Sequence, residues 1–319
     1  MKNRSSGVRS AVLLGSAVLA LALVACGAAP GTITEYSANG NPVSITAGPD
    51  HNLWFTEYNG NKIGRITPNG IITQYPVPTA NAGPDGITAG PHNLWFTEST
   101  GNKIGRITTG GVITEYPLPT ANAGPGGITA GPDHNLWFTE STSNEIGKIT
   151  PSGVITQYPL PTAGALPGGI TAGPGGNLWF TEYNGNKIGK ITTGGIITEY
   201  PVPTAYAGPE GIAAGPDHNL WFTEQDGNKI GKITTGGSIT EYPLPTANAG
   251  PEGITAGPDG NLWFTEEDGN KIGKITPSGV ITEYPVPTAG KEPNAITAGP
   301  DHNLWFTSSG RNKIGKIVP

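Results

Sequence analysis

The chain has 319 residues, a formal net charge of −6 and only 13% charged residues, with no basic stripe, which argues against a nucleic-acid partner. Its single cysteine, Cys26, excludes an intrachain disulfide and a cysteine-based metal cluster. The 50 glycines and 31 prolines would be typical of disorder if they were scattered. They recur instead at fixed places along the chain, which indicates turns.

The first 25 residues differ in composition from everything that follows. Three basic residues precede the apolar stretch 11–23, which at about 13 residues is too short to span a membrane and is typical of a signal peptide. The stretch ends in Leu-Val-Ala-Cys, which resembles a bacterial lipobox. We therefore predict a lipoprotein signal peptide over 1–25, then a lipidated Cys26 and a short tether over 26–31. An ordinary signal peptide cut near Ala25 or Ala28 is the alternative.

This prediction places the protein outside the cytoplasm. The expected location is the outer face of the bacterial cytoplasmic membrane, or the periplasm or outer membrane if the source has two membranes. Two acyl chains anchor a protein stably, whereas one alone gives marginal binding.

The sequence Asn-Leu-Trp-Phe-Thr-Glu recurs through the rest of the chain and defines a repeat. Its tryptophans are separated by 41 residues once and by 42 residues five times, and they are Trp54, Trp95, Trp137, Trp179, Trp221, Trp263 and Trp305. Each repeat contains four short β-rich runs separated by turns, without any helical period. Four strands in about 42 residues, repeated seven times, predict a seven-bladed β-propeller over 32–319.

The two ends of the repeat series predict how the ring closes. The series begins with a fourth strand, residues 32–36, and it ends with a third strand, residues 313–318. We therefore expect the N-terminal strand to complete the last blade, which leaves no open sheet edge. An open β-solenoid is the structural alternative.

Regular positions in the repeat are assigned to structural roles. The tryptophans and the tyrosines of the fourth strand are expected in the core. The histidines precede Asn in the turn between the first and second strands, where glycine also occurs, so we interpret them as turn residues. In five repeats the glutamate that ends the second strand faces a lysine across a hairpin, which predicts ion pairs at a solvated rim, whereas the third repeat has Glu145 in place of the lysine and the last has Ser308 in place of the glutamate.

The loops between blades vary more, and they meet at one end of the central channel, which we call the top. The motif Pro-x-(Gly/Ala/Ser)-Ile delivers its x residue there, and these residues are Val43, Asp85, Gly126, Gly168, Glu210, Glu252 and Asn294. Carboxylates at one channel end could hold a hard cation. Three tyrosines outside the regular positions, Tyr58, Tyr183 and Tyr206, could stack on a flat ligand.

The repeat motifs Trp-Phe-Thr-Glu, Asn-Lys-Ile-Gly-Arg-Ile-Thr, Ile-Thr-Glu-Tyr and Pro-x-Gly-Ile-Thr resemble those of the virginiamycin B lyase (streptogramin B lyase) family over residues 32–319. The resemblance implies a seven-bladed propeller that opens the ester of streptogramin B antibiotics by elimination, a carbon–oxygen lyase with Mg²⁺ at the top mouth. It also implies histidines at the last two x positions, which here are Glu252 and Asn294. Glu292 matches an acidic position of the family, whereas Ser308 and Ser309 stand where another acid is expected.

Two functions follow. The first is a monomeric, lipid-anchored module that binds a small molecule or an extracellular protein at the top mouth through Asp85, Glu210, Glu252, Glu292, Tyr58, Tyr183 and Tyr206. The second is a lyase for a cyclic ester in which Glu252 and Asn294 replace the catalytic histidines and Glu252 and Glu292 hold a divalent cation such as Mg²⁺.

Overall fold

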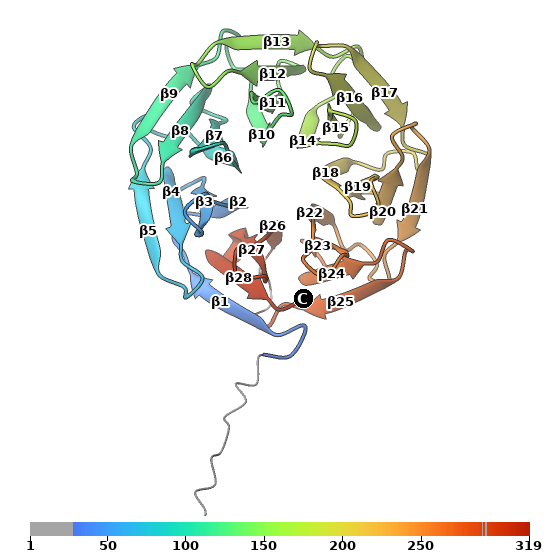
Figure 1. The fold of residues 1–319 in the computed structure, drawn as a ribbon. Coiled ribbons are helices and arrows are strands. Elements are labelled where there is room, and N and C mark those ends of the chain that lie inside the picture. The colour runs from blue at the N-terminus through green and yellow to red at the C-terminus, as the bar shows by residue number, and fades with distance from the viewer. Residues whose placement is uncertain (1–27, 289, 291) are drawn as a thin grey trace, which may run out of the picture.

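A computed structural model describes residues 28–288, 290 and 292–319, which form seven four-stranded antiparallel sheets in a closed ring (Figure 1). The first strand of each sheet lines the centre and the fourth lies at the rim. The predicted all-β seven-bladed propeller is therefore confirmed. Within the described ranges the helical element is a 3-10 turn, η1 (Ser309–Arg311), and no helix there is a candidate for crossing a membrane.

Each blade contains strands A, B, C and D in order from the centre outwards. Blades 1 to 3 are β2 (Pro42–Ala47), β3 (Leu53–Glu57), β4 (Lys62–Ile66), β5 (Ile72–Pro76); β6 (Pro84–Ala89), β7 (Asn93–Glu98), β8 (Lys103–Thr108), β9 (Ile113–Pro117); and β10 (Pro125–Ala130), β11 (Leu136–Glu140), β12 (Glu145–Ile149), β13 (Ile155–Pro159). Blades 4 to 6 are β14 (Pro167–Ala172), β15 (Asn177–Glu182), β16 (Lys187–Thr192), β17 (Ile197–Pro201); β18 (Pro209–Ala214), β19 (Leu220–Glu224), β20 (Lys229–Ile233), β21 (Ile239–Pro243); and β22 (Pro251–Ala256), β23 (Leu262–Glu266), β24 (Lys271–Ile275), β25 (Ile281–Pro285). Blade 7 is β26 (Pro293–Ala298), β27 (Leu304–Ser308), β28 (Lys313–Ile317) and β1 (Ile33–Ser37).

The ring closes through β1, which is hydrogen-bonded to β28 in an antiparallel register that places Ile33 opposite Ile317. This confirms the predicted closure, with the strand one residue later than expected. Ile33 packs into the core between blades 6 and 7, and Tyr36 packs into the core between blades 7 and 1. The N-terminal strand therefore contributes both a sheet edge and core contacts.

The core lies between neighbouring blades, as the aromatic pattern predicted. Trp54 of blade 1, for example, packs with Leu94 and Phe96 of blade 2. Every tryptophan is at most 2% exposed and stacks on a strand-D tyrosine with ring centroids 5.6–5.7 Å apart. The phenylalanine ring of strand B packs against a glycine of strand C. A Cβ at Gly64 would lie 2.1 Å from the Phe55 ring, so this position has no room for a side chain.

The predicted ion pairs at a solvated rim are wrong. Glu98 ends strand B opposite Lys103, yet its side chain is fully buried, and burial with the nearby charge of Glu115 raises its pKa to about 8. Lys103 instead forms an ion pair with Glu115, whose oxygen lies 2.7 Å away. The spacing of charges along the hairpin could not show that the side chain of the strand-B glutamate folds beneath the following loop. The glutamates buried at this position are Glu57, Glu98, Glu140, Glu182, Glu224 and Glu266.

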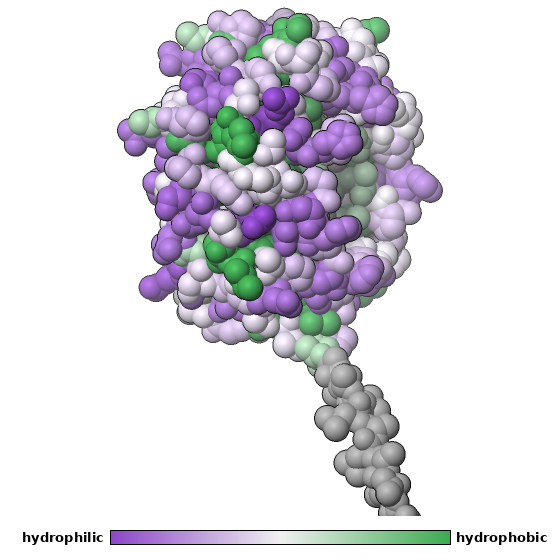
Figure 2. All heavy atoms as spheres, turned by 60° about the vertical axis from the view of Figure 1, so that its left-hand side comes forward, coloured by the Kyte–Doolittle hydropathy of each residue, from purple (hydrophilic) through white to green (hydrophobic). Residues whose placement is uncertain are grey.

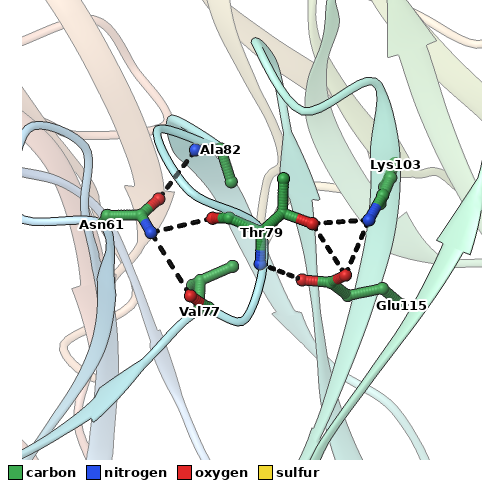
Figure 3. Close-up of polar contacts among 6 residues, drawn as sticks. All are labelled: Asn61, Val77, Thr79, Ala82, Lys103 and Glu115. Carbon is green, nitrogen blue, oxygen red and sulfur yellow. Dashed lines mark hydrogen bonds and ion pairs between the residues drawn. The ribbon is translucent and has the colours of Figure 1, made fainter.

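The D–A loop that joins blade 1 to blade 2 is fixed by two sets of hydrogen bonds (Figure 3). The Asn61 amide donates to the carbonyl oxygen of Thr79 at 2.9 Å and accepts from the Ala82 N–H at 2.8 Å. Thr79 donates its N–H and hydroxyl to Glu115 of the next blade, at 2.9 and 2.8 Å. These bonds hold the loop that leads into the channel, so the residues at its end have defined positions.

Candidate functional site

The x residues enter the channel because strand A begins with an irregularity. In blade 2, Pro84 lies opposite Glu98 and Ile87 opposite Phe96, so two residues, Asp85 and Gly86, bulge out of the ladder. A β-bulge redirects side chains and often lies beside a functional site. The same shift occurs in all seven A–B pairs.

A ring of threonine hydroxyls fixes this bulge. Thr223 accepts the Gly211 N–H at 2.8 Å and donates to the carbonyl oxygen of Glu252 in the next blade at 2.6 Å. A Cβ at Gly211 would lie 2.2 Å from that carbonyl oxygen, so glycine allows blades 5 and 6 to approach closely at this position. The backbone that carries each x residue is therefore bonded to the preceding blade, and its side chain is free to face the cavity.

These side chains surround a cavity of about 550 Å³ at the top of the channel. All seven x residues line it, which agrees with the expectation that the D–A loops deliver them to the central mouth. The lining contains three carboxyl groups, those of Asp85, Glu210 and Glu252, and no lysine, arginine or histidine among the described residues. The cavity is therefore a site with an excess of acidic groups.

Glu252 is the centre of this acidic wall. The Asn294 amide donates to one of its oxygens, and the Gln225 amide donates to the other at 3.1 Å. Burial and the charges of Glu267 and Glu210 raise the pKa of Glu252 to about 9. Burial, Asp268 and Glu292 also raise the pKa of Glu267, which shares a hydrogen bond with Glu252. The pair therefore holds a proton at neutral pH.

Asp85 and Glu210 add two further carboxyls with raised pKa values. Burial raises the pKa of Asp85 to about 6. Burial, followed by the charges of Asp85 and Glu267, raises the pKa of Glu210 to about 7. These groups repel one another, and the described residues of the cavity lining give them no basic partner. A positive charge placed among them would therefore be stabilised.

The wall formed by blades 3 and 4 is different in character. Its x residues are Gly126 and Gly168, so no side chain projects there, and Leu166 and Tyr183 stand beside them. The Tyr183 hydroxyl donates to Asp226 at 2.8 Å, and burial together with that carboxylate raises the pKa of Tyr183 to about 12. This wall offers backbone, an aliphatic side chain and an aromatic ring.

The other predicted site residues lie outside the cavity. Tyr58 is 37% exposed and lies 3.4 Å from the Thr100 hydroxyl, whereas Tyr206 is 89% exposed. Glu292 is exposed in the D–A loop before blade 7, and its charge raises the pKa of Glu267. Among the described residues, no three His, Asp or Glu side chains are placed to hold one metal ion together. The metal role of Glu252 and Glu292 therefore stays a prediction.

Sequence reasoning missed Glu267, Gln225 and Leu166. Glu267 and Gln225 are the first residues of their B–C loops, the position occupied by Tyr58 and Tyr183 in other blades, so the repeat alignment contained the signal. Leu166 lies directly before the Pro of its x motif, where four other blades have glycine. Its φ of 53° shows that a bulky residue is held in the left-handed region.

Comparisons with known proteins agree with this architecture. A model of the virginiamycin B lyase family matches residues 22–206 and 130–319. The chain is similar in structure to a virginiamycin B lyase from Staphylococcus aureus, with a TM-score of 0.87 and 45% identity over 90% of this chain and 99% of that one. It is also similar to a catalytically inactive histidine-to-alanine variant of a virginiamycin B lyase from Staphylococcus aureus with quinupristin, with a TM-score of 0.86, 44% identity and coverage of 90% and 99%.

The curated relatives match over a much shorter stretch. A virginiamycin B lyase from Bordetella bronchiseptica is 44% identical over 46 residues, which are 14% of this chain and 15% of that protein. One from Nocardia farcinica is 39% identical over 57 residues, which are 18% and 20% of the two chains.

Proposed function

The chain belongs to the virginiamycin B lyase family, and we propose that it uses the family's propeller to bind a small organic cation in the cavity at the top mouth. The observation that carries the proposal is the convergence of Asp85, Glu210 and Glu252 on one cavity whose described lining residues include no basic side chain. An ammonium group would replace the proton that Glu252 holds, and it would relieve the repulsion among the three carboxyls.

The opposite wall supports an amphipathic ligand. Gly126 and Gly168 leave that side of the cavity flat, and Leu166 and Tyr183 provide apolar surface beside it. A molecule with a ring at one end and an amine at the other would contact both walls at once. Small-molecule sites are commonly apolar with a few polar groups that set orientation.

The state of Glu252 argues against efficient general-base chemistry. Burial and the charges of Glu267 and Glu210 raise the pKa of Glu252 and keep it mainly protonated at pH 7, and a protonated carboxyl cannot accept a proton. Asn294 cannot accept a proton at neutral pH, since its amide is not basic. The resemblance described above implies histidines at both positions, and the residues present are not equivalent to them. Binding therefore fits these side chains better than proton abstraction.

Isothermal titration with 2-phenylethylamine tests the proposal, with 2-phenylethanol as the neutral counterpart. We expect the amine to bind with release of a proton, which two buffers of different ionisation enthalpy would detect. Glu252→Gln should weaken binding by about tenfold or more, because a charge-assisted contact is lost. Glu145→Gln, the same change at a half-buried acid of β12 outside the cavity lining, is the matched control. Equal binding of amine and alcohol would contradict the proposal.

A lyase reaction is the second candidate, favoured by family membership and by Glu252, Asn294 and Glu292 at the positions that the resemblance assigns. Incubation with a streptogramin B antibiotic and Mg²⁺, followed by mass spectrometry, would detect the linear product. We expect no turnover approaching about 1 s⁻¹, the lower end of ordinary enzyme rates. Turnover that Glu252→Gln abolishes would replace the binding function by the lyase.

We further propose that Cys26 carries lipid and that the protein works outside the cytoplasm as a monomer. Cys26 and the apolar stretch before it lie outside the described residues, so support comes from the sequence alone. Metabolic labelling with an alkynyl fatty acid should modify the native chain and leave Cys26→Ala unlabelled. Equal labelling of the two would contradict lipidation at this position.

A further inference from the structure

We propose that the bottom face of the propeller, opposite the acidic cavity, docks on an anionic lipid surface. The bottom face consists of the A–B and C–D turns. Its C–D turns place an aliphatic side chain at the same position in five blades, and these residues are Ile71, Val112, Val154, Ile196 and Val280. Each is 61–70% exposed.

These five side chains form one ring because the blades repeat the same geometry. A single exposed aliphatic residue needs no explanation, but an apolar ring at the outer edge of one face is a candidate contact surface. The surface in Figure 2 is mainly hydrophilic, with hydrophobic residues in separate clusters. Ser238 occupies the equivalent position in blade 5, so the turn does not require an aliphatic residue.

Basic side chains lie directly beside the aliphatic ring. Arg65 donates to the carbonyl oxygen of Thr109 at 3.5 Å, three residues before Val112 in the same turn. Arg106 contacts the Val154 turn at 3.5 Å, Lys148 the Ile196 turn at 3.5 Å, and Lys316 the Ile71 turn at 3.3 Å. Aliphatic residues interleaved with lysine and arginine are typical of surfaces that bind anionic bilayers.

The two faces also differ in charge. Among the described residues, the bottom carries seven basic side chains, Arg65, Arg106, Lys148, Lys190, Lys232, Lys274 and Lys316, against five aspartates, Asp50, Asp133, Asp217, Asp259 and Asp301. Every other described acidic side chain belongs to the top loops, to the strand ends that carry them, or to the strand-D position that contacts them. Four of the bottom basic side chains, those of Arg65, Lys232, Lys274 and Lys316, lie 3.6–3.9 Å from an aspartate of the same face, so the bottom has a small excess of positive charge. An anionic surface would therefore be repelled less by the bottom than by the acidic top.

The point at which the chain joins the propeller supports the same orientation. Gly31 donates its N–H to the carbonyl oxygen of Val318 at 2.8 Å, at the bottom end of β28. The chain before Ala28 is therefore joined to the propeller at this face, and it includes Cys26, the predicted lipidation site. A fluid bilayer also needs no shape complementarity, which suits a ring of similar, separated contacts better than a folded protein partner does.

Vesicle flotation with residues 28–319 tests the proposal without the leader or Cys26, since this segment contains every strand of the ring. Vesicles of phosphatidylcholine with about one-third phosphatidylglycerol should bind the protein, and vesicles of phosphatidylcholine alone should bind it weakly. Replacing the five aliphatic residues by serine, as found naturally at Ser238, should lower the partition coefficient by about tenfold or more. The matched control is Tyr206→Asn, which removes an exposed apolar residue from the top; Asn81, Asn122 and Asn248 occupy this position elsewhere.

A second measurement does not depend on the serine variant. An environment-sensitive dye on Ser238→Cys should shift to the blue on anionic vesicles, whereas the same dye on Asn59→Cys, in a top loop, should not. No binding to the anionic vesicles, or a shift at residue 59 and not at 238, would overturn the proposal. Neither result would bear on amine binding, which titration in solution measures separately.

Discussion

At the scale of single residues, two positions beside the cavity are held in an unfavourable backbone conformation. Leu166 and Glu292 have φ values of 53° and 50°, at the position before the x-motif proline. Gly83, Gly124, Gly208 and Gly250 occupy that position in four other blades, and Asn41 in a fifth. Residues in such regions cost about 1–3 kcal/mol and are concentrated at functional sites. We interpret Leu166 as an apolar contact retained for the ligand.

Leu166→Gly should therefore increase the free energy of unfolding by about 1 kcal/mol and weaken binding of the phenyl group in the same protein. Thermal unfolding and amine titration measure the two effects. Leu166→Asn is the control, because it introduces the residue found at the equivalent position, Asn41. It lowers the backbone strain but keeps a side chain at this position. A variant that is less stable would show that packing of the Leu166 side chain outweighs its backbone strain.

At the scale of the strands, the buried glutamates of strand B meet the next-but-one strand of the same blade. In blades 1 and 3 strand D supplies a glutamine, and Gln74 donates to Glu57 at 2.6 Å. In blades 2, 4, 5 and 6 it supplies a glutamate, and burial with that second carboxyl raises the pKa of Glu98, Glu182, Glu224 and Glu266 to about 8. These four groups are protonated in the folded state at neutral pH.

The sign of the resulting pH dependence follows from this shift. An acid whose folded pKa is above its unfolded value of 4.5 binds a proton more tightly when folded. Its contribution to stability is complete below about pH 4.5 and is lost as the pH rises towards 8. Denaturant unfolding should therefore show lower stability at pH 8 than at pH 5. Replacing the four glutamates by glutamine should flatten this dependence, and a stability that rises between pH 5 and 8 would contradict the assignment.

At the scale of the whole molecule, the ring depends on its N-terminal strand. β1 supplies all five residues that pair with β28, and Ile33, Tyr36 and Ala38 contribute to the cores on both sides of blade 7. Without it, blade 7 would expose a strand edge and two inter-blade cores would lose contacts.

Deleting residues 32–37 should lower the melting temperature of the entire propeller in one cooperative transition. Residues 28–319 are the control, since they differ only in retaining this strand. Differential scanning calorimetry decides the matter, and an unchanged melting temperature would show that the ring is held by the other six blades alone.

The fold was predictable because its signals are local and repeated. Trp54 and its equivalents recur at a nearly constant spacing, and the alternating apolar residues around them specify four strands per repeat. The series of repeats begins with a fourth strand and ends with a third strand, and this indicated that the N-terminal strand completes the last blade. The x residues could be assigned to the central mouth for the same reason, because equivalent positions in a closed ring meet at its axis.

What the sequence by itself determined is therefore the repeat, the number of blades, the closure and the set of residues around the channel mouth. Only the tertiary structure decided how those residues act on each other. The burial of Glu98 beneath its loop, the hydrogen bond between Asn294 and Glu252, and the effect of the Glu267 charge on Glu252 arise between residues that are distant or unrelated in the pattern. Such effects depend on angstrom-scale distances and on desolvation, and neither is encoded in spacing along the chain.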